Sequence, residues 1–360
     1  MDSATRVPVT TVGTGSDPRS LVGMAAFIVL LHVLGWGVLL GIVVPQHLQL
    51  GDRVFGVGLG LTAYTLGMRH AFDADHIAAI DNTTRKQLAD GGRPLSIGFW
   101  FSLGHSTVVL VLVVLLSAGV SSLAGSLADD NSTLQQATGL FGTLVSGLFL
   151  LLIGTVNLVV LAGIVRVFVR MRRDGRADEA ALEQQLSSRG GTMAGGARRA
   201  TATVTRPWHL YPVGLLFGLG FDTATEVGLL VLAGGAAAVS LPWYAILTLP
   251  ILFAAGMCLL DTADGVLMLR AYGWASDRPV RKVFYNLTVT SLSVAVALLI
   301  GGIELVGALV NRAGITSGPL AAIAAIDLND LGYLVVGLFL IAWLLAVAVW
   351  KFGRIEQRWS

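Results

Sequence analysis

The sequence predicts an all-α, polytopic membrane protein with eight transmembrane helices. Of its 360 residues, 54% are hydrophobic and only 13% are charged, and the mean hydropathy is +0.76. A chain this apolar is expected to have lipid as the solvent for much of its surface. Apolar segments of about 20 residues, enough to cross roughly 30 Å of hydrocarbon as a helix, recur along the chain. The single cysteine, Cys258, excludes a disulfide framework and a CxxC metal or redox site.

The apolar segments can be taken in order along the chain. The first follows only two arginines, ends at Pro45 without a small-residue cleavage site and is too long for the apolar region of a signal peptide. We therefore expect it to be a permanent helix of the protein. The predicted transmembrane helices are 20–44, 54–80, 97–119, 138–166, 211–238, 243–270, 283–310 and 331–352.

The distribution of positive charge predicts the orientation of these helices. The two termini and every second loop together contain 21 of the 24 Lys and Arg residues. The remaining loops contain 2, and Arg69 lies within a helix. Segments rich in Lys and Arg usually face the cytoplasm, so both termini are expected to be cytoplasmic. An odd number of helices would break the alternation, which therefore favours eight.

Polar segments divide the chain. Residues 1–19, which mix Thr, Gly, Ser and Pro, are predicted to be a disordered cytoplasmic N-terminus. The Arg-rich segment 167–210 is predicted to be a cytoplasmic linker between helices one to four, 20–166, and helices five to eight, 211–352. Residues 353–360 are predicted to be a short cytoplasmic tail.

Ionisable residues are concentrated in four of the predicted helices. In hydrocarbon an ionised group is costly unless it is paired, hydrated or coordinated, so these residues are functional candidates. Counting from the helix ends places all of them in the middle to cytoplasmic half of the membrane, which indicates one shared site or pathway. They are Arg69, His70, Asp73, Asp75 and His76 in the segment RHAFDADHI of helix two, His105 in helix three, Asp222 and Glu226 in helix five, and Asp261 and Asp264 in helix six.

These donor types favour a divalent transition metal. Imidazole nitrogen and carboxylate oxygen without thiolate suit Ni²⁺ and Co²⁺, whereas Mg²⁺ and Ca²⁺ prefer oxygen ligands. On a helix, His70, Asp73 and His76 share a face, but the two histidines would lie about 9 Å apart along the axis. They can bind one ion only if the helix is broken or kinked, or if the ion moves between them. Arg69, one turn from Asp73, is the expected counter-ion when no metal is bound.

Architectural roles are the alternative for each group taken alone. The oppositely charged residues of helix two could be a structural pair, and His105 could make interhelical hydrogen bonds. The acidic pairs of helices five and six could form a proton relay or position the helices. His32, in the middle of helix one, is on its own most simply an interhelical hydrogen-bonding residue. Asn157 and Glu304 are isolated in the sequence, and we assign neither a role.

Taken together, the motifs resemble those of the nickel/cobalt transporter family, the NiCoT permeases. The H-x4-D-H signature (His70, Asp75, His76) is followed in order by LGHSTVV, LGFDTATE and DTADG, and the resemblance covers nearly the whole chain. It implies high-affinity uptake of Ni²⁺ or Co²⁺ across the cytoplasmic membrane by a single polypeptide, with the helix-two signature central to ion binding. It also implies that Phe72 and His32 tune selectivity, which makes His32 a candidate site residue and favours cobalt handled alongside nickel.

The resemblance and the donor types together give the expected site. We expect no cofactor, because Ni²⁺ or Co²⁺ is the transported substrate. The expected partners are that ion and the lipid bilayer, and no nucleic acid is expected to bind. The chain has no G-x4-GK[ST] loop, so we expect no ATPase subunit and transport driven by ion gradients or voltage. The expected metal residues are His32, His70, Asp73, Asp75, His76 and His105, and the expected pathway residues are Arg69, Phe72, Asp222, Glu226, Asp261 and Asp264.

Two other functions could use the same residue types. A metal exporter would need the same ligands, and the direction of transport cannot be deduced from them. An intramembrane metalloenzyme is disfavoured because an HExxH motif is absent. We therefore expect a protein that is not an enzyme.

A short internal similarity bears on the mechanism. The segments 72–77 and 221–227 both place Phe-Asp before a further acidic residue. They lie in helices predicted to run in opposite directions, as in transporters built from inverted repeats. An inverted-repeat relation between helices two and three and helices five and six is therefore a hypothesis.

Overall fold

The computed structural model describes most of the expected membrane helices. The predicted N-terminal segment, apart from its last two residues, the predicted tail, most of the predicted linker, and both Asp222 and Glu226 lie outside the described residues. The described residues are 18–51, 53–90, 92–118, 132–174, 204–220, 229, 232–236, 241–276, 279–326, 328 and 331–352.

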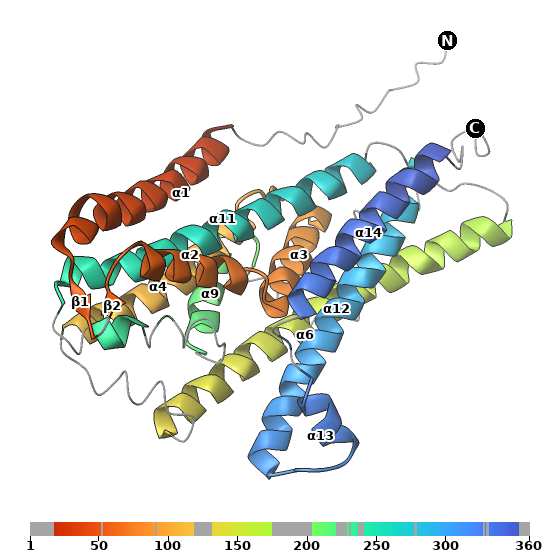
Figure 1. Ribbon diagram of the computed structural model, residues 1–360. Helices are drawn as coiled ribbons and strands as arrows, with labels where there is room; N and C mark the ends of the chain where they lie inside the picture. The colour runs from red at the N-terminus through yellow and green to blue at the C-terminus, as the bar shows by residue number, and fades with distance from the viewer. Residues whose placement is uncertain are drawn as a thin grey trace.

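Helices form nearly all of the regular structure (Figure 1). The one sheet among the described residues is a two-stranded antiparallel hairpin. In chain order the elements are α1 (Pro18–Val38), η1 (Leu39–Val43), η2 (Val44–Gln46), β1 (Gln49–Leu50), β2 (Arg53–Val54), α2 (Val57–His70), α3 (Ala74–Ala89), α4 (Ile97–Ser117), α6 (Thr133–Asp174), η4 (Pro207–His209), α9 (Leu210–Gly218), α11 (Trp243–Ser276), α12 (Pro279–Ala313), α13 (Pro319–Ala324) and α14 (Leu331–Phe352).

Five spans among the described residues are long and apolar enough to cross a membrane. They correspond to predicted helices one, three, four, six and seven, and a shorter apolar helix lies in predicted helix eight. Large apolar side chains on their outer faces are exposed, among them Val33, Leu148 and Leu299, as expected of surfaces that face lipid. The protein is therefore an all-α polytopic membrane protein. The five spans are Arg19–Gln46, Ile97–Ser117, Thr133–Gly163, Trp243–Ala271 and Thr290–Ala313.

The predicted helix 54–80 is two helices, α2 and α3, which are separated by residues 71–73. The prediction of one continuous helix is therefore wrong. α3 also continues to Ala89, through residues that were expected to form a cytoplasmic loop. Arg85 and Lys86 are only 8% and 7% exposed. They stay buried because neighbouring elements supply acceptors, such as the Ser293 hydroxyl for Arg85 at 2.8 Å.

The long helix α11 lies at the centre of the contacts between helices. It packs against α1, α2, α3 and α4, while α4 also packs against α9, and α6 packs along α12. Figure 1 shows α1 and α2 beside α11 and, on the far side of α3, α12 and α14. Two apolar clusters meet at the break after α2, because Ala71 belongs to one cluster and Ala74 to the other. The break therefore lies inside the protein rather than at its surface.

Candidate metal centre

The break between α2 and α3 is built from tight backbone turns. The Asp73 N–H donates to the His70 carbonyl at 2.9 Å, which ends α2, and Asp73 itself is extended (φ −62°, ψ 139°), which turns the chain into α3. Aspartate at this position commonly caps the following helix. Asp73 makes no such side-chain bond, and its Oδ2 lies 2.7 Å from His70 Nδ1 instead. The residue that begins α3 is thus directed back toward the end of α2.

This break brings three imidazoles together. One ligand nitrogen from each of His70, His76 and His105 lies within 4.8 Å of the others. The ring centroids of His70 and His76 are 4.6 Å apart, much closer than the distance of about 9 Å along a continuous helix. All three residues are at most 2% exposed. We refer to His70, His76 and His105 as the three-histidine centre.

The Asp73 carboxylate determines which nitrogen of His70 faces this centre. His70 Nδ1 lies 2.7 Å from Asp73 Oδ2, and this carboxylate favours the tautomer that carries its proton on Nδ1 and its lone pair on Nε2. That Nε2 lies 2.9 Å from His105 Nε2, so without an ion the two rings share a hydrogen bond. A metal ion would replace the shared proton and bind the lone pair of each ring. The tautomer that Asp73 favours is the one that metal binding through His70 Nε2 requires.

His76 has a similar arrangement with an acid from α11. Its Nδ1 lies 3.4 Å from Asp261 Oδ2, and both residues are 1% exposed. Among the described residues, neither nitrogen of His76 has a hydrogen-bond partner, while the Asp261 carboxylate lies near the Ser102 hydroxyl. The rings of Phe101 and Phe253 lie against His76 and His70, so the surroundings are largely apolar. Buried polar groups left in this way are costly, and a cation near them would offset that cost.

The donor set of the three-histidine centre fits a first-row transition metal. Metal–imidazole bonds of about 2.1 Å allow ligand nitrogens to lie up to about 4.2 Å apart around one ion. The observed limit of 4.8 Å therefore needs only small side-chain movements to close. Nitrogen donors suit Ni²⁺, Co²⁺, Cu²⁺ and Zn²⁺, and they disfavour Mg²⁺ and Ca²⁺.

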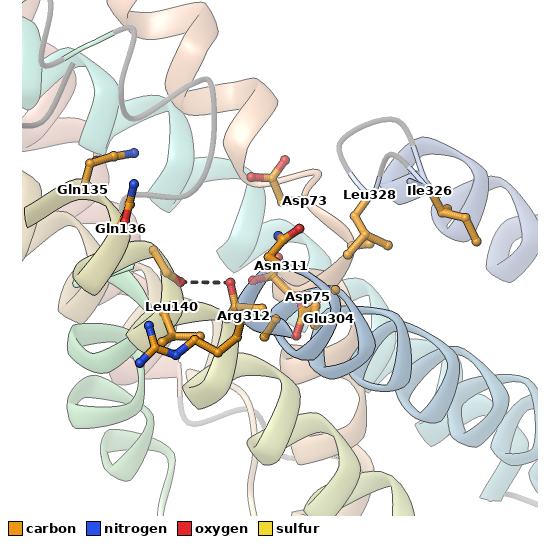
Figure 2. A pocket seen from close by; sticks show the side chains of 15 residues that line it. Asp73, Asp75, Gln135, Gln136, Leu140, Glu304, Asn311, Arg312, Ile326 and Leu328 are labelled. Atoms are coloured by element: carbon orange, nitrogen blue, oxygen red, sulfur yellow. Dashed lines mark hydrogen bonds between the residues drawn. The ribbon is translucent and has the colours of Figure 1, made fainter. Parts of the chain in front are cut away.

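Asp75 lies outside the three-histidine centre although it belongs to the same sequence signature. It is in the first turn of α3, where its Oδ1 accepts a hydrogen bond from the His76 N–H at 2.9 Å. Its side chain lines a cavity of about 750 Å³ together with Asp73 and Glu304 (Figure 2). The signature therefore contributes to two adjoining places, with its imidazoles in the centre and its carboxylate at the cavity.

Two of the expected selectivity and site residues lie away from the centre. His32 on α1 places Nδ1 2.8 Å from the Ile28 carbonyl and Nε2 3.2 Å from the Tyr64 hydroxyl. Phe72, within the break, stacks on Tyr333 of α14 with ring centroids 5.1 Å apart. Their effect on selectivity stays a prediction.

Two of the expected pathway residues, Arg69 and Asp264, lie on α2 and α11. Arg69 is exposed in the last turn of α2. Asp264 follows Asp261 by one turn on α11 and interacts electrostatically with Asp81 of α3. The roles of these residues, like those of Asp222 and Glu226 outside the described chain, stay predictions.

Sequence reasoning missed several buried polar contacts between helices. Asn157 of α6 donates to Asn82 Oδ1 of α3 at 2.8 Å, and Ser146 of α6 donates to Glu304 Oε2 of α12 at 2.7 Å. Asn157 and Glu304 have no ionisable neighbours within a turn of their own helices, so the sequence alone did not reveal these partners. The available signal was their presence in an apolar span, since a lone polar group at that depth is a functional candidate.

Comparison with known proteins shows similarity over almost the whole chain. The family model described as "High-affinity nickel-transport protein" (NicO) matches residues 56–349. The chain is 59% identical to the nickel transporter NicT of Mycobacterium tuberculosis, over 94% of this chain and 90% of NicT. It is 46% identical to the nickel transporter NixA of Staphylococcus aureus, over 93% and 95% of the two chains. It is 40% identical to the cobalt transport protein NhlF of Rhodococcus rhodochrous, over 92% of each chain. No solved structure matches the chain.

Proposed function

Because this chain belongs to the NicO family of high-affinity nickel-transport proteins, we propose that it takes up Ni²⁺ or Co²⁺ across the cell membrane as a single-polypeptide permease. In this proposal His70, His76 and His105 bind the ion on its path across the membrane. The observation that carries the proposal is the meeting of these three buried imidazoles beside the break between α2 and α3. Relatives named for nickel and for cobalt match 94% and 92% of the chain, which supports both ions as substrates.

The surroundings of the three-histidine centre suit a dication that must also leave it. Three neutral imidazoles supply nitrogen ligands, while Asp73 and Asp261 supply negative charge next to the ligands rather than on the ion. The Asp73 carboxylate, 2.7 Å from His70 Nδ1, also orients the ring of His70. From the centre, the ion moves along α3 and α11 past Asp261 and Asp264 toward the cytoplasm. Asp222 and Glu226 of predicted helix five contribute to the same pathway.

The energy for uptake comes from the membrane potential rather than from ATP. A charge of 2+ gains about 4.6 kcal/mol for each 100 mV, twice the value for a single charge. This corresponds to an accumulation of about three orders of magnitude at equilibrium. The proposed permease therefore requires no ATPase subunit, no cofactor and no catalytic step.

Eight membrane crossings with both termini in the cytoplasm are part of the proposal. In this topology α2 and α3 together form the second crossing, α9 begins the fifth and α14 is the eighth. A crossing that is broken at the binding site is common in secondary transporters, where irregular backbone lines the site. The charge distribution of the sequence supports this orientation.

The inverted-repeat relation is supported by two matching sets of helix contacts. One joins α2 to α11 and the other joins α9 to α4. In each set, one helix carries Y-x-x-G and its partner carries F-x-x-G, and a Cβ on either glycine would meet the carbonyl of the partner's aromatic residue. Exchanging helix two with five and helix three with six converts one set into the other, as an inverted repeat requires. The residues are Tyr64, Gly67, Phe253 and Gly256 in the first set and Tyr211, Gly214, Phe101 and Gly104 in the second.

The proposed function is tested by metal accumulation. Cells that lack their own nickel uptake should accumulate Ni²⁺ when they express this chain, and His70→Ala, His76→Ala or His105→Ala should abolish the accumulation without removing the protein from the membrane. His47→Asn is the matched control, because His47 is exposed and in a left-handed conformation that asparagine tolerates. Depletion of cellular nickel would instead indicate export. Normal uptake by the three alanine variants would refute the proposed binding site.

A further inference from the structure

A cavity of about 750 Å³ adjoins the break between α2 and α3. Figure 2 shows its walls, which come from the start of α3, the first turns of α6, the last turns of α12 and the chain before α14. In the proposed topology these ends of α6 and α12 face the outside of the cell. The cavity is therefore on the side from which an ion would approach the three-histidine centre.

The lining of this cavity favours a hydrated cation. It contains three carboxylates, those of Asp73, Asp75 and Glu304, and one guanidinium, that of Arg312. The side-chain amides of Gln135, Gln136 and Asn311 also line it, and their oxygens can accept hydrogen bonds from water bound to an ion. A concave surface with an excess of one sign of charge concentrates ions of the opposite sign.

Glu304 is held in place by another helix. It is 9% exposed, and its Oε2 accepts a hydrogen bond from Ser146 of α6 at 2.7 Å. A carboxylate at this depth is costly unless it is paired, hydrated or coordinated, which makes Glu304 a functional candidate. A carboxylate has about four acceptor sites, so Glu304 can accept from water bound to an ion while it keeps the hydrogen bond from Ser146.

The cavity adjoins the three-histidine centre through two residues. Asp73 lines the cavity, and its Oδ2 lies 2.7 Å from His70 Nδ1. Asp75 lines the cavity, and its Oδ1 accepts from the His76 N–H. An ion that moves from the cavity to the centre would therefore pass the carboxylates of Asp73 and Asp75 before it reaches the imidazole ligands.

The two places differ in the form of the ion that they can hold. Six waters occupy about 180 Å³ at about 30 Å³ each, so a fully hydrated dication fits within the cavity. The three-histidine centre, with its nitrogens within 4.8 Å of one another, has room only for an ion that has lost water. We propose that the cavity is a separate binding site for the hydrated Ni²⁺ or Co²⁺ ion and that Glu304, with Asp75 and Asp73, holds the ion there before it is dehydrated. This inference rests on the proposed function of uptake.

The charge of Glu304 can be removed without changing its shape. Glu304→Gln keeps an oxygen that can accept from Ser146, so we expect the KM for Ni²⁺ uptake to rise about tenfold with the maximal rate little changed. The KM of the variant should also depend less on ionic strength, because salt screens the attraction that the substitution removes. Asn311→Asp, which adds a carboxylate to the same cavity, should lower the KM.

The control variant separates charge from helix packing. Ser146→Ala removes the hydrogen bond between α6 and α12 and leaves the carboxylate, so its KM should stay within about twofold of the parental value, because the charge that attracts the ion is kept. An unchanged KM in both Glu304→Gln and Asn311→Asp would overturn the inference. So would a KM in Ser146→Ala as high as that in Glu304→Gln.

Chemical labelling tests the position of the cavity independently of transport. Cys258 is buried, so the parental chain should not react with a membrane-impermeant thiol reagent. In intact cells, Asn311→Cys should react with the reagent, and Ni²⁺ should slow the reaction. Labelling only from the cytoplasmic side, or labelling that Ni²⁺ does not affect, would refute this site. Neither result would bear on the proposed function, which nickel uptake by the parental chain tests separately.

Discussion

Two carboxylates next to the three-histidine centre affect the tautomer and the basicity of its imidazoles. Asp73 and Asp261 each lie against one imidazole, at 2.7 Å and 3.4 Å. Neighbours of this kind fix the tautomer of a ligand histidine and raise its basicity. They also place negative charge close to a bound dication without occupying its coordination sites.

Removal of the Asp73 charge should weaken metal binding without abolishing it. Asp73→Asn keeps the size of the side chain but lets the amide donate to His70, so the favoured tautomer is no longer fixed. We expect the Kd of the purified protein for Ni²⁺, measured by calorimetry, to rise about 10- to 100-fold. Asp90→Asn is the control, because Asp90 pairs with Lys86 at the other end of α3. Equal affinities of the Asp73→Asn and parental proteins would contradict the role assigned to Asp73.

At the residue scale, the sequence predicted the chemistry better than the geometry. The histidines and acids of RHAFDADHI stood out because ionisable groups are rare in hydrocarbon. The joining of His70 and His76 depends on a backbone break that no glycine or proline between them announces. The direction of Asp75 toward a cavity depends on α6 and α12, which lie far away in the sequence. Glu304 remained unassigned for the same reason.

At the scale of elements, the break after α2 is covered by the first turn of α14. The α14 backbone approaches so closely that a Cβ on Gly332 would clash with the Phe72 carbonyl. The neighbouring Tyr333 ring stacks on Phe72. This contact shields the irregular backbone of the break from lipid, where unpaired polar groups are costly.

Substitution of Gly332 should therefore disturb the break. Gly332→Ala places a methyl group against a backbone carbonyl that cannot move as a flexible side chain would, and overpacking of this kind costs about 1 to 3 kcal/mol. We expect a lower unfolding temperature in detergent and a loss of most nickel uptake. Gly337→Ala, in the same helix but with open space where its methyl group would lie, should behave like the parental protein. A Gly332→Ala protein with parental stability and uptake would show that the close approach is not needed.

Hydropathy predicted most elements because apolar length is a local property. The predicted helices one, three, four, six and seven coincide with the five apolar spans of the described residues. α3 was cut short in the prediction because the sequence DNTTRKQ resembles a polar loop. Its partners, such as Asn157 and Ser293, come from α6 and α12. Only the folded bundle shows that these polar residues are buried.

At the scale of the whole molecule, uptake should follow the membrane potential. The proposed gain of about 4.6 kcal/mol per 100 mV for a dication requires no nucleotide. Vesicles with purified protein and an imposed inside-negative potential should accumulate Ni²⁺ without ATP, and an ionophore that abolishes the potential should abolish accumulation beyond the external concentration. Accumulation that needs ATP at constant potential would contradict the proposed energy source.

The two matching sets of helix contacts give a test of the proposed repeat. Gly67 meets the Phe253 carbonyl, and its counterpart Gly214 meets the Phe101 carbonyl. If helices two and three are related to helices five and six, Gly67→Ala and Gly214→Ala should lower nickel uptake and thermal stability by similar amounts. Each change forces a packed helix pair apart at about 1 to 3 kcal/mol. Gly58→Ala, on α2 with open space around it, should have little effect.

The measurement compares the variants at matched amounts of protein in the membrane. Glycines at these interfaces let the helix backbones approach closely, so a paired effect on uptake is expected if the two halves move in related ways around the three-histidine centre. A severe loss in one glycine variant beside full activity in its counterpart would show that the two contact sets are not equivalent. The inverted-repeat relation would then fail, while the evidence for metal binding by His70, His76 and His105 would be unaffected, because it rests on their geometry alone.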